Sequence, residues 1–153
     1  MFYLPLCPPK RMQRKNLVKY KYNIGCSLDN LLGARDFIRQ SLKKHVSSEV
    51  TLNEIVLAID EMCSNLMIHA HHCDPDHMLE LTIQAKEKGN LIFEIEDDGT
   101  VFDINAFQEP TLDNLITVKR KGGLGIRLVK SIMDNIEYEL RDGKNVCRLT
   151  KRV

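Results

Sequence analysis

The sequence predicts an α+β fold, a two-layer sandwich in which a mostly antiparallel mixed sheet carries its helices on one face. Two observations lead to this fold class: some segments alternate strictly between apolar and polar residues, as half-buried strands do, and longer ones show the 3.6-residue apolar period of amphipathic helices. A third is their order, namely strand, two helices, hairpin, long loop, helix and hairpin. The 153 residues suit one domain with its own core.

The N-terminal part of the chain divides into an arm and the start of the domain. Residues 1–16 lack apolar periodicity and contain three prolines, so we expect a flexible arm, followed by one domain over residues 17–153. A half-buried strand is predicted next, because apolar residues alternate with polar ones at Val18, Tyr20, Tyr22 and Ile24. Ser27 has the character of an N-cap, and the apolar spacing after it predicts a helix to about His45.

A second helix is predicted over residues 51–70. Thr51 and Glu54 form an S/T-x-x-E capping box, in which each side chain satisfies a backbone amide of the first turn. A broad apolar face follows at helical spacing, formed by Leu52, Ile55, Ile59, Met62, Cys63 and Leu66. The other side has a stripe that mixes apolar and polar residues, namely Leu57, Glu61, Asn65 and Ile68. This mixture indicates a second face that is buried or covered by a ligand.

Two hairpins and a third helix complete the predicted domain. Alternating apolar residues around a Lys-Gly-Asn turn at 88–90 predict two antiparallel strands, at 79–85 and 91–95. The glycines of 122–125 open a helix with its own apolar face. An Asp-Gly turn at 142–143 predicts a closing hairpin, with strands near 136–140 and 146–150.

Composition excludes several classes of protein. Hydrophobic residues make up 43% of the chain and charged residues 28%, as in globular proteins and unlike disordered tails. The 22 basic and 21 acidic residues give a net charge of +1, so no overall field favours nucleic acid or an anionic membrane. No apolar stretch approaches membrane-spanning length, and the start does not resemble a secretory signal. The five cysteines are odd in number and scattered, so we expect reduced thiols and a cytoplasmic location.

Asp97 is a candidate ligand-binding residue because period-2 counting places it on the same face as Leu91, Phe93 and Ile95. A carboxylate at an inward position needs a partner. It can accept a hydrogen bond from a ligand in a pocket, and Gly99 would then let the backbone approach that ligand closely. The alternative is that the strand has already ended and Asp97 is a turn residue.

The segment Gly122-Gly123-Leu124-Gly125 is a candidate anion site because it lies directly before a predicted helix. Backbone amides and the positive end of the helix dipole both face a ligand at such a position, and phosphate is the natural candidate. Glycines before helices are also ordinary turn devices, and the spacing here is neither that of a P-loop nor that of a dinucleotide fingerprint.

Glu61 and Asn65 lie one turn apart on the mixed stripe of the second helix. The amide oxygen of Asn65 suits Mg²⁺, while Glu61 can accept a proton from a hydroxyl that attacks a phosphate. Each residue alone is also typical of a solvated helix surface. The combination with the glycine segment and Asp97 gives the pair its functional interpretation.

Three segments resemble the motifs of the GHKL ATPase superfamily in the order in which that superfamily has them. Glu61-x-x-x-Asn65 within AIDEMCSNLMIHAH resembles the N box, DDGTVFD from Asp97 resembles the first glycine box, and GGLGIRLVKSIMD from Gly122 resembles the second. Their separations are similar to those of the short anti-sigma factors that are also serine kinases. Many superfamily members have a second glycine where Val101 stands, and the short anti-sigma kinases often carry a bulkier residue there.

The resemblance implies a Bergerat-type ATP-binding fold and a role for each candidate residue. Asn65 would coordinate Mg²⁺ at the ATP phosphates, Asp97 would accept the adenine amino hydrogen, and Glu61 would be the catalytic base. Gly99 and the glycine segment, Gly122, Gly123, Leu124 and Gly125, would contact the nucleotide. The segment from Thr100 to Lys121 resembles a lid over ATP. Positive charge at the phosphates would come from one of the three basic residues at its end, Lys119, Arg120 and Lys121, and we choose Lys121.

The function implied is an anti-sigma regulatory factor that binds Mg-ATP and phosphorylates a serine of an antagonist protein, thereby controlling release of a sigma factor. A homodimer is a further expectation from the resemblance. One alternative is an ATP-dependent protein-binding switch without kinase activity, in which ATP only sets the lid conformation. The other is a detached histidine-kinase catalytic domain, which would need a separate dimerisation helix with its acceptor histidine.

Overall fold

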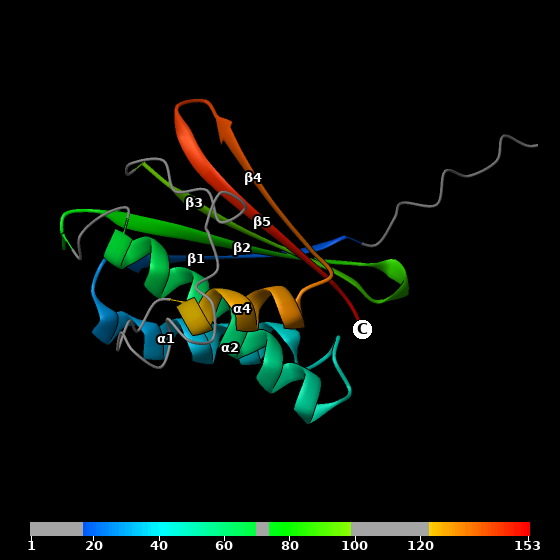
Figure 1. Cartoon of the computed structure of the whole chain (residues 1–153). Coiled ribbons are helices and arrows are strands. Elements are labelled where there is room, and N and C mark those ends of the chain that lie inside the picture. Colours follow the sequence, from blue (N-terminus) through cyan, green and yellow to red (C-terminus); the bar gives the residue numbers. More distant parts are fainter. Residues whose placement is uncertain (1–16, 70–73, 99–122) are drawn as a thin grey trace, which may run out of the picture.

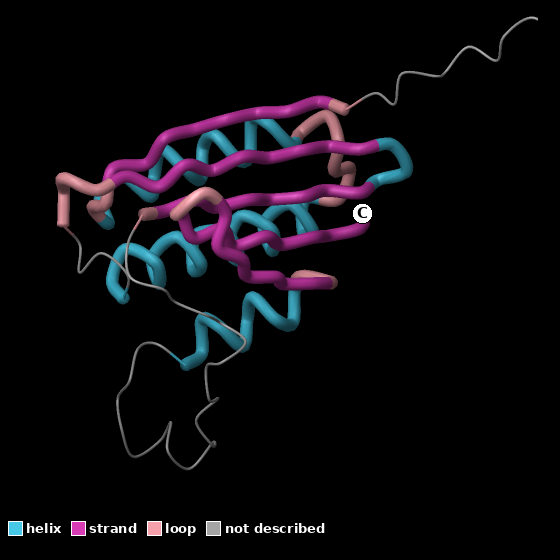
Figure 2. Tube along the Cα trace, turned by 90° about the horizontal axis from the view of Figure 1, so that it is seen from above, coloured by secondary structure: helices cyan, strands magenta, loops and turns pink. Residues whose placement is uncertain are grey.

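The computed structural model describes residues 17–69, 74–98 and 123–153, and the arm predicted for residues 1–16 lies outside them. Figure 1 shows a layer of helices on one face of a single sheet, and Figure 2 shows the same two layers from above. The five strands are β1 (Val18–Gly25), β2 (Met78–Lys86), β3 (Asn90–Asp97), β4 (Asn135–Arg141) and β5 (Lys144–Arg152). The α-helices are α1 (Leu31–Leu42), α2 (Glu49–His69) and α4 (Gly123–Ile132).

The strands pair in the order β1-β2-β3-β5-β4, and every pairing among them is antiparallel. The sheet therefore contains each strand that the alternation in the sequence predicts. The predicted class, an α+β sandwich with helices on one face, is confirmed, and the part described has no parallel pair of strands. The β3–β5 pairing brings the second and last hairpins together, with Asp97 opposite Asn145.

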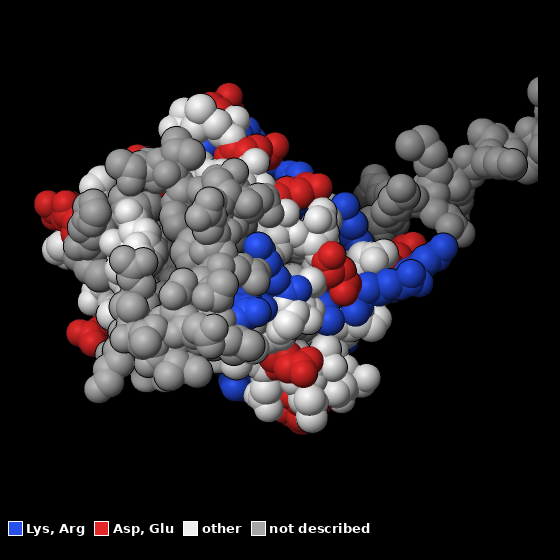
Figure 3. Space-filling view, in the orientation of Figure 1, with Lys and Arg blue, Asp and Glu red and all other residues white. Residues whose placement is uncertain are grey.

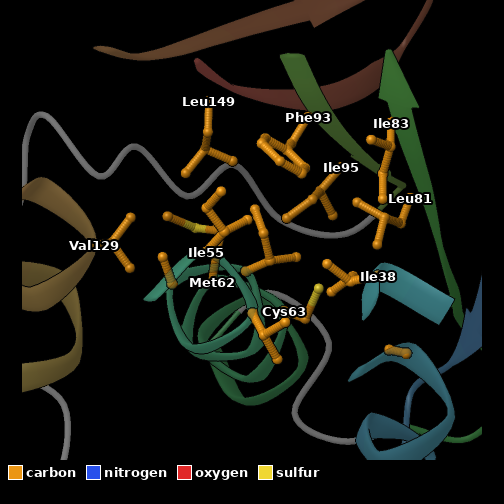
Figure 4. Packing of buried hydrophobic residues seen from close by; sticks show 14 of the residues in the cluster. Ile38, Ile55, Met62, Cys63, Leu81, Ile83, Phe93, Ile95, Val129 and Leu149 are labelled. Atoms are coloured by element: carbon orange, nitrogen blue, oxygen red, sulfur yellow. The ribbon is translucent and has the colours of Figure 1, made fainter. Parts of the chain in front are cut away.

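The core lies between the sheet and the helices, as Figure 4 shows for side chains from both layers. The predicted apolar face of α2 is buried, with Ile55, Ile59, Met62 and Leu66 all at 0% exposure. Opposite them lie the inward residues of the strands, among which Leu81, Ile83, Phe93 and Ile95 are also fully buried. Burying a side chain of this size stabilises the fold by about 1.5–3 kcal/mol, so this interface is a main source of stability.

The prediction of a helix from Ser27 to about His45 is wrong at both ends. Ser27 precedes a short 3-10 turn, Leu28–Asn30, and makes no capping hydrogen bond through its side chain, so α1 begins only at Leu31. The helix ends at Leu42 because the chain turns there, with the backbone amides of His45 and Val46 both donating to the Leu42 carbonyl oxygen. This turn directs the buried Val46 side chain into the core.

The capping box predicted for Thr51 and Glu54 is also wrong. Helix α2 begins at Glu49, and the cap comes from Ser48, whose Oγ accepts a hydrogen bond from the Thr51 backbone amide at 3.2 Å. Sequence periodicity could not reveal the extra residues, because Val50 in the added turn is 68% exposed and belongs to no apolar stripe. The predicted turn chemistry is confirmed at the last hairpin, where Asp142 and Gly143 both have positive φ, of 51° and 76°.

The face of the sheet opposite the helices carries an ion-pair network around Glu94. This residue is 7% exposed, and its Oε1 accepts hydrogen bonds from Arg148 Nη2 at 2.7 Å and from Arg141 Nη2 at 3.3 Å. Burial by itself would raise the pKa of Glu94, but the two guanidinium groups outweigh it and hold the pKa below its ordinary value. The network therefore stabilises the β3–β5–β4 part of the sheet while Glu94 is ionised.

Replacing Glu94 with glutamine should lower the free energy of unfolding by about 1–2 kcal/mol at neutral pH, because two partly buried guanidinium groups lose their acceptor. Since the folded-state pKa is depressed, the contribution is complete above the ordinary glutamate pKa of about 4.3 and disappears as pH falls through the folded value. Urea unfolding of both proteins at neutral and acid pH measures this. Glu137→Gln, an exposed carboxylate 3.5 Å from Arg148, is the matched control. A wild-type advantage that persists at the lowest pH would contradict the assignment.

Three cysteines, Cys26, Cys63 and Cys147, are buried as thiols, and burial raises the pKa of Cys63 well above its ordinary value. No helix among the described residues is both long and apolar enough to cross a membrane. Figure 3 shows both signs of charge on the face that it draws, with a group of basic side chains over α4. This distribution agrees with the near-zero net charge of the sequence.

Candidate functional site

The C-terminal part of α2, the C-terminal end of β3 and the start of α4 lie at the same end of the molecule in both Figure 1 and Figure 2. Helices α2 and α4 also pack against each other. The fold therefore places at one end the three segments from which the sequence predicts a site.

Asn65 is the buried member of the mixed stripe on α2. It is 4% exposed, and within the described residues its Nδ2 atom is buried with no hydrogen-bond partner. An unsatisfied buried amide costs about 1–3 kcal/mol, so its position calls for a ligand or a partner. Leu57 and Ile68 on the same stripe are 43% and 42% exposed. The predicted second buried face is thus present at Asn65 and absent at these two residues.

Glu61 lies one turn before Asn65 and points at the beginning of α4. A Cβ atom built on Gly125 would overlap Glu61 Oε2 and would lie 3.1 Å from Glu61 Cδ. The glycine at position 125 therefore makes room for the carboxylate beside the N-terminal turn of the helix. The helix dipole favours negative charge at this end. Glu61 and the glycine segment, which are far apart in the sequence, form one local arrangement.

Asp97 is the last residue of β3 and is 3% exposed, so the strand interpretation holds and the turn alternative is wrong. Its Oδ1 accepts a hydrogen bond from Asn145 Nδ2 at 3.2 Å, and Asn145 on β5 is itself 2% exposed. The two side chains form a polar pair at the end of an otherwise apolar inward face. Asn145 is a site residue that the sequence did not reveal, because a single asparagine beside a turn carries no signal of its cross-strand partner.

A bidentate ion pair between Arg35 on α1 and Asp60 on α2 holds the two helices together next to the site. Arg35 Nε and Nη2 donate to the Asp60 carboxylate at 2.7 and 3.1 Å. Asp60 directly precedes Glu61, so this pair helps to fix the rotation of α2 that turns Glu61 toward α4. An arginine–carboxylate pair with two parallel hydrogen bonds fixes the relative orientation of the two side chains and also contributes favourable interaction energy.

A cavity of about 300 Å³ is lined in part by Asp97 but has the wrong charge for phosphate. Its walls carry five carboxylates, from Asp76, Glu80, Glu96, Asp97 and Asp98, against one lysine and one histidine, Lys144 and His77. Phosphates would be repelled by the acidic majority. Among the described surfaces, the start of α4 is therefore the better position for an anionic group.

The remaining predicted contacts fall at the edge of what the structure describes. Gly123 begins α4, as the glycine segment predicts, and Leu124 and Gly125 continue it. Gly99, Lys121 and Gly122 lie outside the described residues, as do the predicted lid from Thr100 to Lys121 and the charges of Lys119 and Arg120. For these residues the assignments remain predictions.

The donor set fits a nucleotide with a bound Mg²⁺ ion. Asn65 offers a buried amide with an unsatisfied atom, which suits coordination by its oxygen and donation by its nitrogen. The N-terminus of α4, with ten residues, offers backbone amides to phosphate. The Asp97–Asn145 pair offers a buried acceptor to a heterocyclic amine. Three kinds of recognition are therefore available within one end of the fold.

Known proteins are similar to this chain in sequence. The serine/threonine-protein kinase BtrW of Bordetella bronchiseptica is 28% identical over 96 residues, which cover 63% of this chain and 67% of the relative. The serine-protein kinase RsbW of Halalkalibacterium halodurans is 30% identical over 104 residues, covering 65% of this chain and 62% of the relative. The anti-sigma F factor of Heyndrickxia coagulans is 24% identical over 107 residues, covering 69% and 71%. The alignments thus span about two thirds of these proteins.

Solved structures share the fold. The SiaB–SiaC complex from Pseudomonas aeruginosa contains a chain that superposes with a TM-score of 0.64 at 14% identity, covering 90% of this chain and 91% of that one. The RsbU and RsbW domains of a Mycobacterium tuberculosis protein give a TM-score of 0.60 at 14% identity, covering 88% of this chain and 32% of that one. At this identity the likeness concerns the fold alone.

Residues 26–151 match a protein family that is described as the histidine kinase-like ATPase domain. This range includes all three motifs and each described site residue. The chain is therefore a member of the family of histidine kinase-like ATPase domains, as its N box and glycine boxes predict.

Proposed function

We propose that this chain is a cytoplasmic anti-sigma regulatory factor that uses Mg-ATP to phosphorylate a serine of an antagonist protein and thereby controls release of a sigma factor. The observation that carries the kinase assignment is the Glu61 carboxylate held against Gly125 at the start of α4. The relatives named serine-protein kinase and anti-sigma F factor support both parts of the proposal. A homodimer is the proposed functional unit, and light scattering of the purified chain measures it.

In the proposed mechanism, Asp97 binds the adenine amino group and the amides at the start of α4 bind the phosphates. Asn65 holds Mg²⁺, which supplies positive charge to the triphosphate when it is bound. Glu61 accepts the proton of the attacking serine hydroxyl. A bond forms between the serine oxygen and the γ-phosphorus, the bond from that phosphorus to the β,γ-bridging oxygen breaks, and ADP leaves. The transfer is direct, with no covalent intermediate on this chain.

A phosphoryl-transfer assay tests this function. The full chain is incubated with Mg²⁺, γ-labelled ATP and antagonist proteins encoded near its own gene, and phosphoserine is mapped by mass spectrometry. We expect label on one serine of an antagonist and none after that serine is replaced by alanine. If the chain binds ATP and the antagonist but transfers no label, it is an ATP-dependent binding switch, and the kinase proposal is wrong.

Replacing Gly125 with alanine should lower the rate of phosphoryl transfer roughly tenfold, because the new methyl group takes the space of the Glu61 carboxylate and displaces it. Stability should hold or rise, since Glu61 has a flexible side chain and alanine is favoured over glycine in a helix by up to about 1 kcal/mol. Single-turnover kinetics and thermal unfolding measure the two effects. Ser131→Ala, later on the same helical segment, is the control. An unchanged transfer rate in Gly125→Ala would mean that the observed Glu61 position is not the one used in transfer.

A further inference from the structure

The charges of the chain are segregated toward its two ends, although they nearly cancel in total. At the end that holds the site, the cavity lined in part by Asp97 has mainly carboxylates in its walls. The opposite end is formed by the start of β1, the turn between β2 and β3, the last residues of β5 and the loop after α1, as Figure 1 and Figure 2 both show. Six exposed basic residues define this basic end, namely Lys19, Lys43, Lys44, Lys86, Lys88 and Arg152.

Strand register and one hydrogen bond bring the members of the basic end together. Lys86 on β2 pairs with Asn90 on β3, and Asn90 pairs with Arg152 on β5. On the helical side, Tyr20 Oη and His45 Nε2 lie 3.0 Å apart in a hydrogen bond, which holds the loop after α1 against the first half of β1. Figure 3 shows basic side chains extending along this end of the molecule. Segments from four places in the sequence therefore form one surface.

The charge of the basic end is only partly neutralised by the described residues. None of its six basic side chains forms an ion pair with a described residue, whereas Lys21, further along β1, pairs with Glu80. The carboxylates nearby are fewer, namely Glu49, Glu87 and Asp134. Asp134 already accepts a hydrogen bond from the Arg152 backbone amide, at 2.6 Å. The near-zero net charge, from which the sequence predicts no attraction to an anionic membrane, therefore hides a local positive surface.

Exposed apolar side chains and a cavity belong to the same end. The apolar residues are Leu17, Val18 and Val153, with 50%, 40% and 41% of their surface exposed. Val153 is held at the turn between β2 and β3, because its backbone amide donates to the Gly89 carbonyl oxygen at 2.9 Å. The cavity has a volume of about 400 Å³ and is lined in part by Lys86 and Arg152. The basic end thus combines the two attractions that bind proteins to an anionic bilayer, burial of apolar area and electrostatic attraction.

The residues that precede Leu17 have the same combination of side chains. Positions 2–6 are aromatic or aliphatic except for one proline, and four of the six residues at 10–15 are lysine or arginine. This segment is tethered to the basic end, because residue 17 lies there. Aromatic and aliphatic side chains next to a polybasic cluster favour a lipid bilayer over duplex DNA, whose phosphates would use the charge alone.

We propose that the basic end is a docking surface for an anionic lipid bilayer. Its basic side chains contact the phosphate groups of the lipids, and Leu17, Val18 and Val153 enter the boundary between headgroups and acyl chains. The proposed nucleotide site then faces away from the bilayer, because Asn90 and Asp97, the first and last residues of β3, lie about 23 Å apart at 3.3 Å per residue. This inference is independent of the proposed kinase function. It holds the chain at a membrane while its site stays accessible to other proteins.

Vesicle binding by the full chain tests the inference. Anionic vesicles contain phosphatidylglycerol and phosphatidylcholine in equal parts, and neutral vesicles contain phosphatidylcholine alone. We expect the chain to bind the anionic vesicles roughly tenfold or more tightly than the neutral ones, and added salt should weaken the binding. Equal affinity for the two kinds of vesicle, or binding to neither, would overturn the inference.

Two double variants locate the charge that matters. Lys86→Gln with Lys88→Gln should bind the anionic vesicles roughly tenfold or more weakly than wild type, because two charges at the basic end are lost. Lys21→Gln with Lys144→Gln removes the same charge at the acidic end, where Lys144 lines the acidic cavity and Lys21 pairs with Glu80 of its wall. This control should bind like wild type. An equal loss in both double variants would contradict a dedicated surface.

A tryptophan placed at either end shows which end meets the lipid, since the chain has none of its own. Leu17→Trp introduces one at the basic end. Leu140→Trp introduces one at the other end, where Leu140 is 69% exposed and lies opposite Asn145. With anionic vesicles, the emission of Leu17→Trp should shift to shorter wavelength because the ring leaves water, and that of Leu140→Trp should not. Any other pattern would refute docking through the basic end.

Duplex DNA is the competing partner, because its phosphates also attract basic side chains. The chain is bound to anionic vesicles at physiological salt, and an excess of duplex DNA is added before the vesicles are sedimented. We expect the chain to stay with the vesicles, because DNA offers no apolar boundary to the exposed aliphatic side chains. If the DNA displaces it, the basic end recognises polyanions in general and the inference of a lipid surface is wrong.

Discussion

Replacing Glu61 with glutamine is expected to reduce phosphoryl transfer to the antagonist roughly 10²–10⁴-fold while leaving Mg-ATP affinity within about twofold, because glutamine keeps the shape of the side chain but cannot accept the serine proton. Single-turnover assays measure the rate, and calorimetry measures the affinity. Glu61→Ala should behave in the same way with respect to transfer. Both variants must first be shown to unfold like wild type.

Glu54→Gln is the matched control for this experiment, since Glu54 is an exposed glutamate on the same helix. It should phosphorylate the antagonist at the wild-type rate. Wild-type transfer by Glu61→Gln would require withdrawal of the kinase mechanism. A Glu61 variant that also loses ATP binding would contradict the separation of roles along α2, in which Asn65 binds the nucleotide complex and Glu61 acts in the transfer.

Replacing Asp97 with asparagine should weaken ATP binding roughly ten- to hundredfold, because a charge-assisted hydrogen bond to the adenine amino group, worth about 1.5–3 kcal/mol, is lost. The substitution also turns one of the two acceptor atoms into a donor. Calorimetric titration with ATP measures the effect directly.

Asp98→Asn is the control for this substitution, because Asp98 is the adjacent residue, is exposed and hydrogen-bonds to His77 at 3.2 Å. ATP affinity should be unchanged in that variant. Equal ATP affinity for Asp97→Asn and wild type would mean that Asp97 serves the sheet and not the nucleotide.

Most of the fold could be predicted from the sequence because its signals are local. Alternation in β2 and β3 and the apolar period of α2 are properties of neighbouring residues, and the same alternation places Asp97 on the inward face. The helix starts were harder to predict. Ser48, Thr51 and Glu54 follow one another at intervals of three residues, so the sequence permits a cap at either Ser48 or Thr51. The structure uses Ser48, and the exposed first turn leaves no apolar signal to show it.

The site could be predicted only in part, because its contacts join distant segments. The N box and glycine boxes identify Glu61, Asn65 and Asp97 individually, but the approach of Glu61 to Gly125 depends on how α2 packs against α4. Likewise, the partnership of Asp97 with Asn145 depends on the register between β3 and β5. A shift of two residues in that register would keep the apolar alternation of both strands and still remove the pair, and no local signal in the sequence excludes it.

The close approach of Glu61 to Gly125 also has an evolutionary consequence. In the arrangement described, a Cβ atom at position 125 and a carboxylate reaching from position 61 exclude each other, so the two positions should covary among descendants. A lineage that abandons phosphoryl transfer no longer needs the glycine and gains helix stability by acquiring alanine. Alanine at the position equivalent to Gly125 would then mark homologues that have become binding proteins, and it would be readable from their sequences alone.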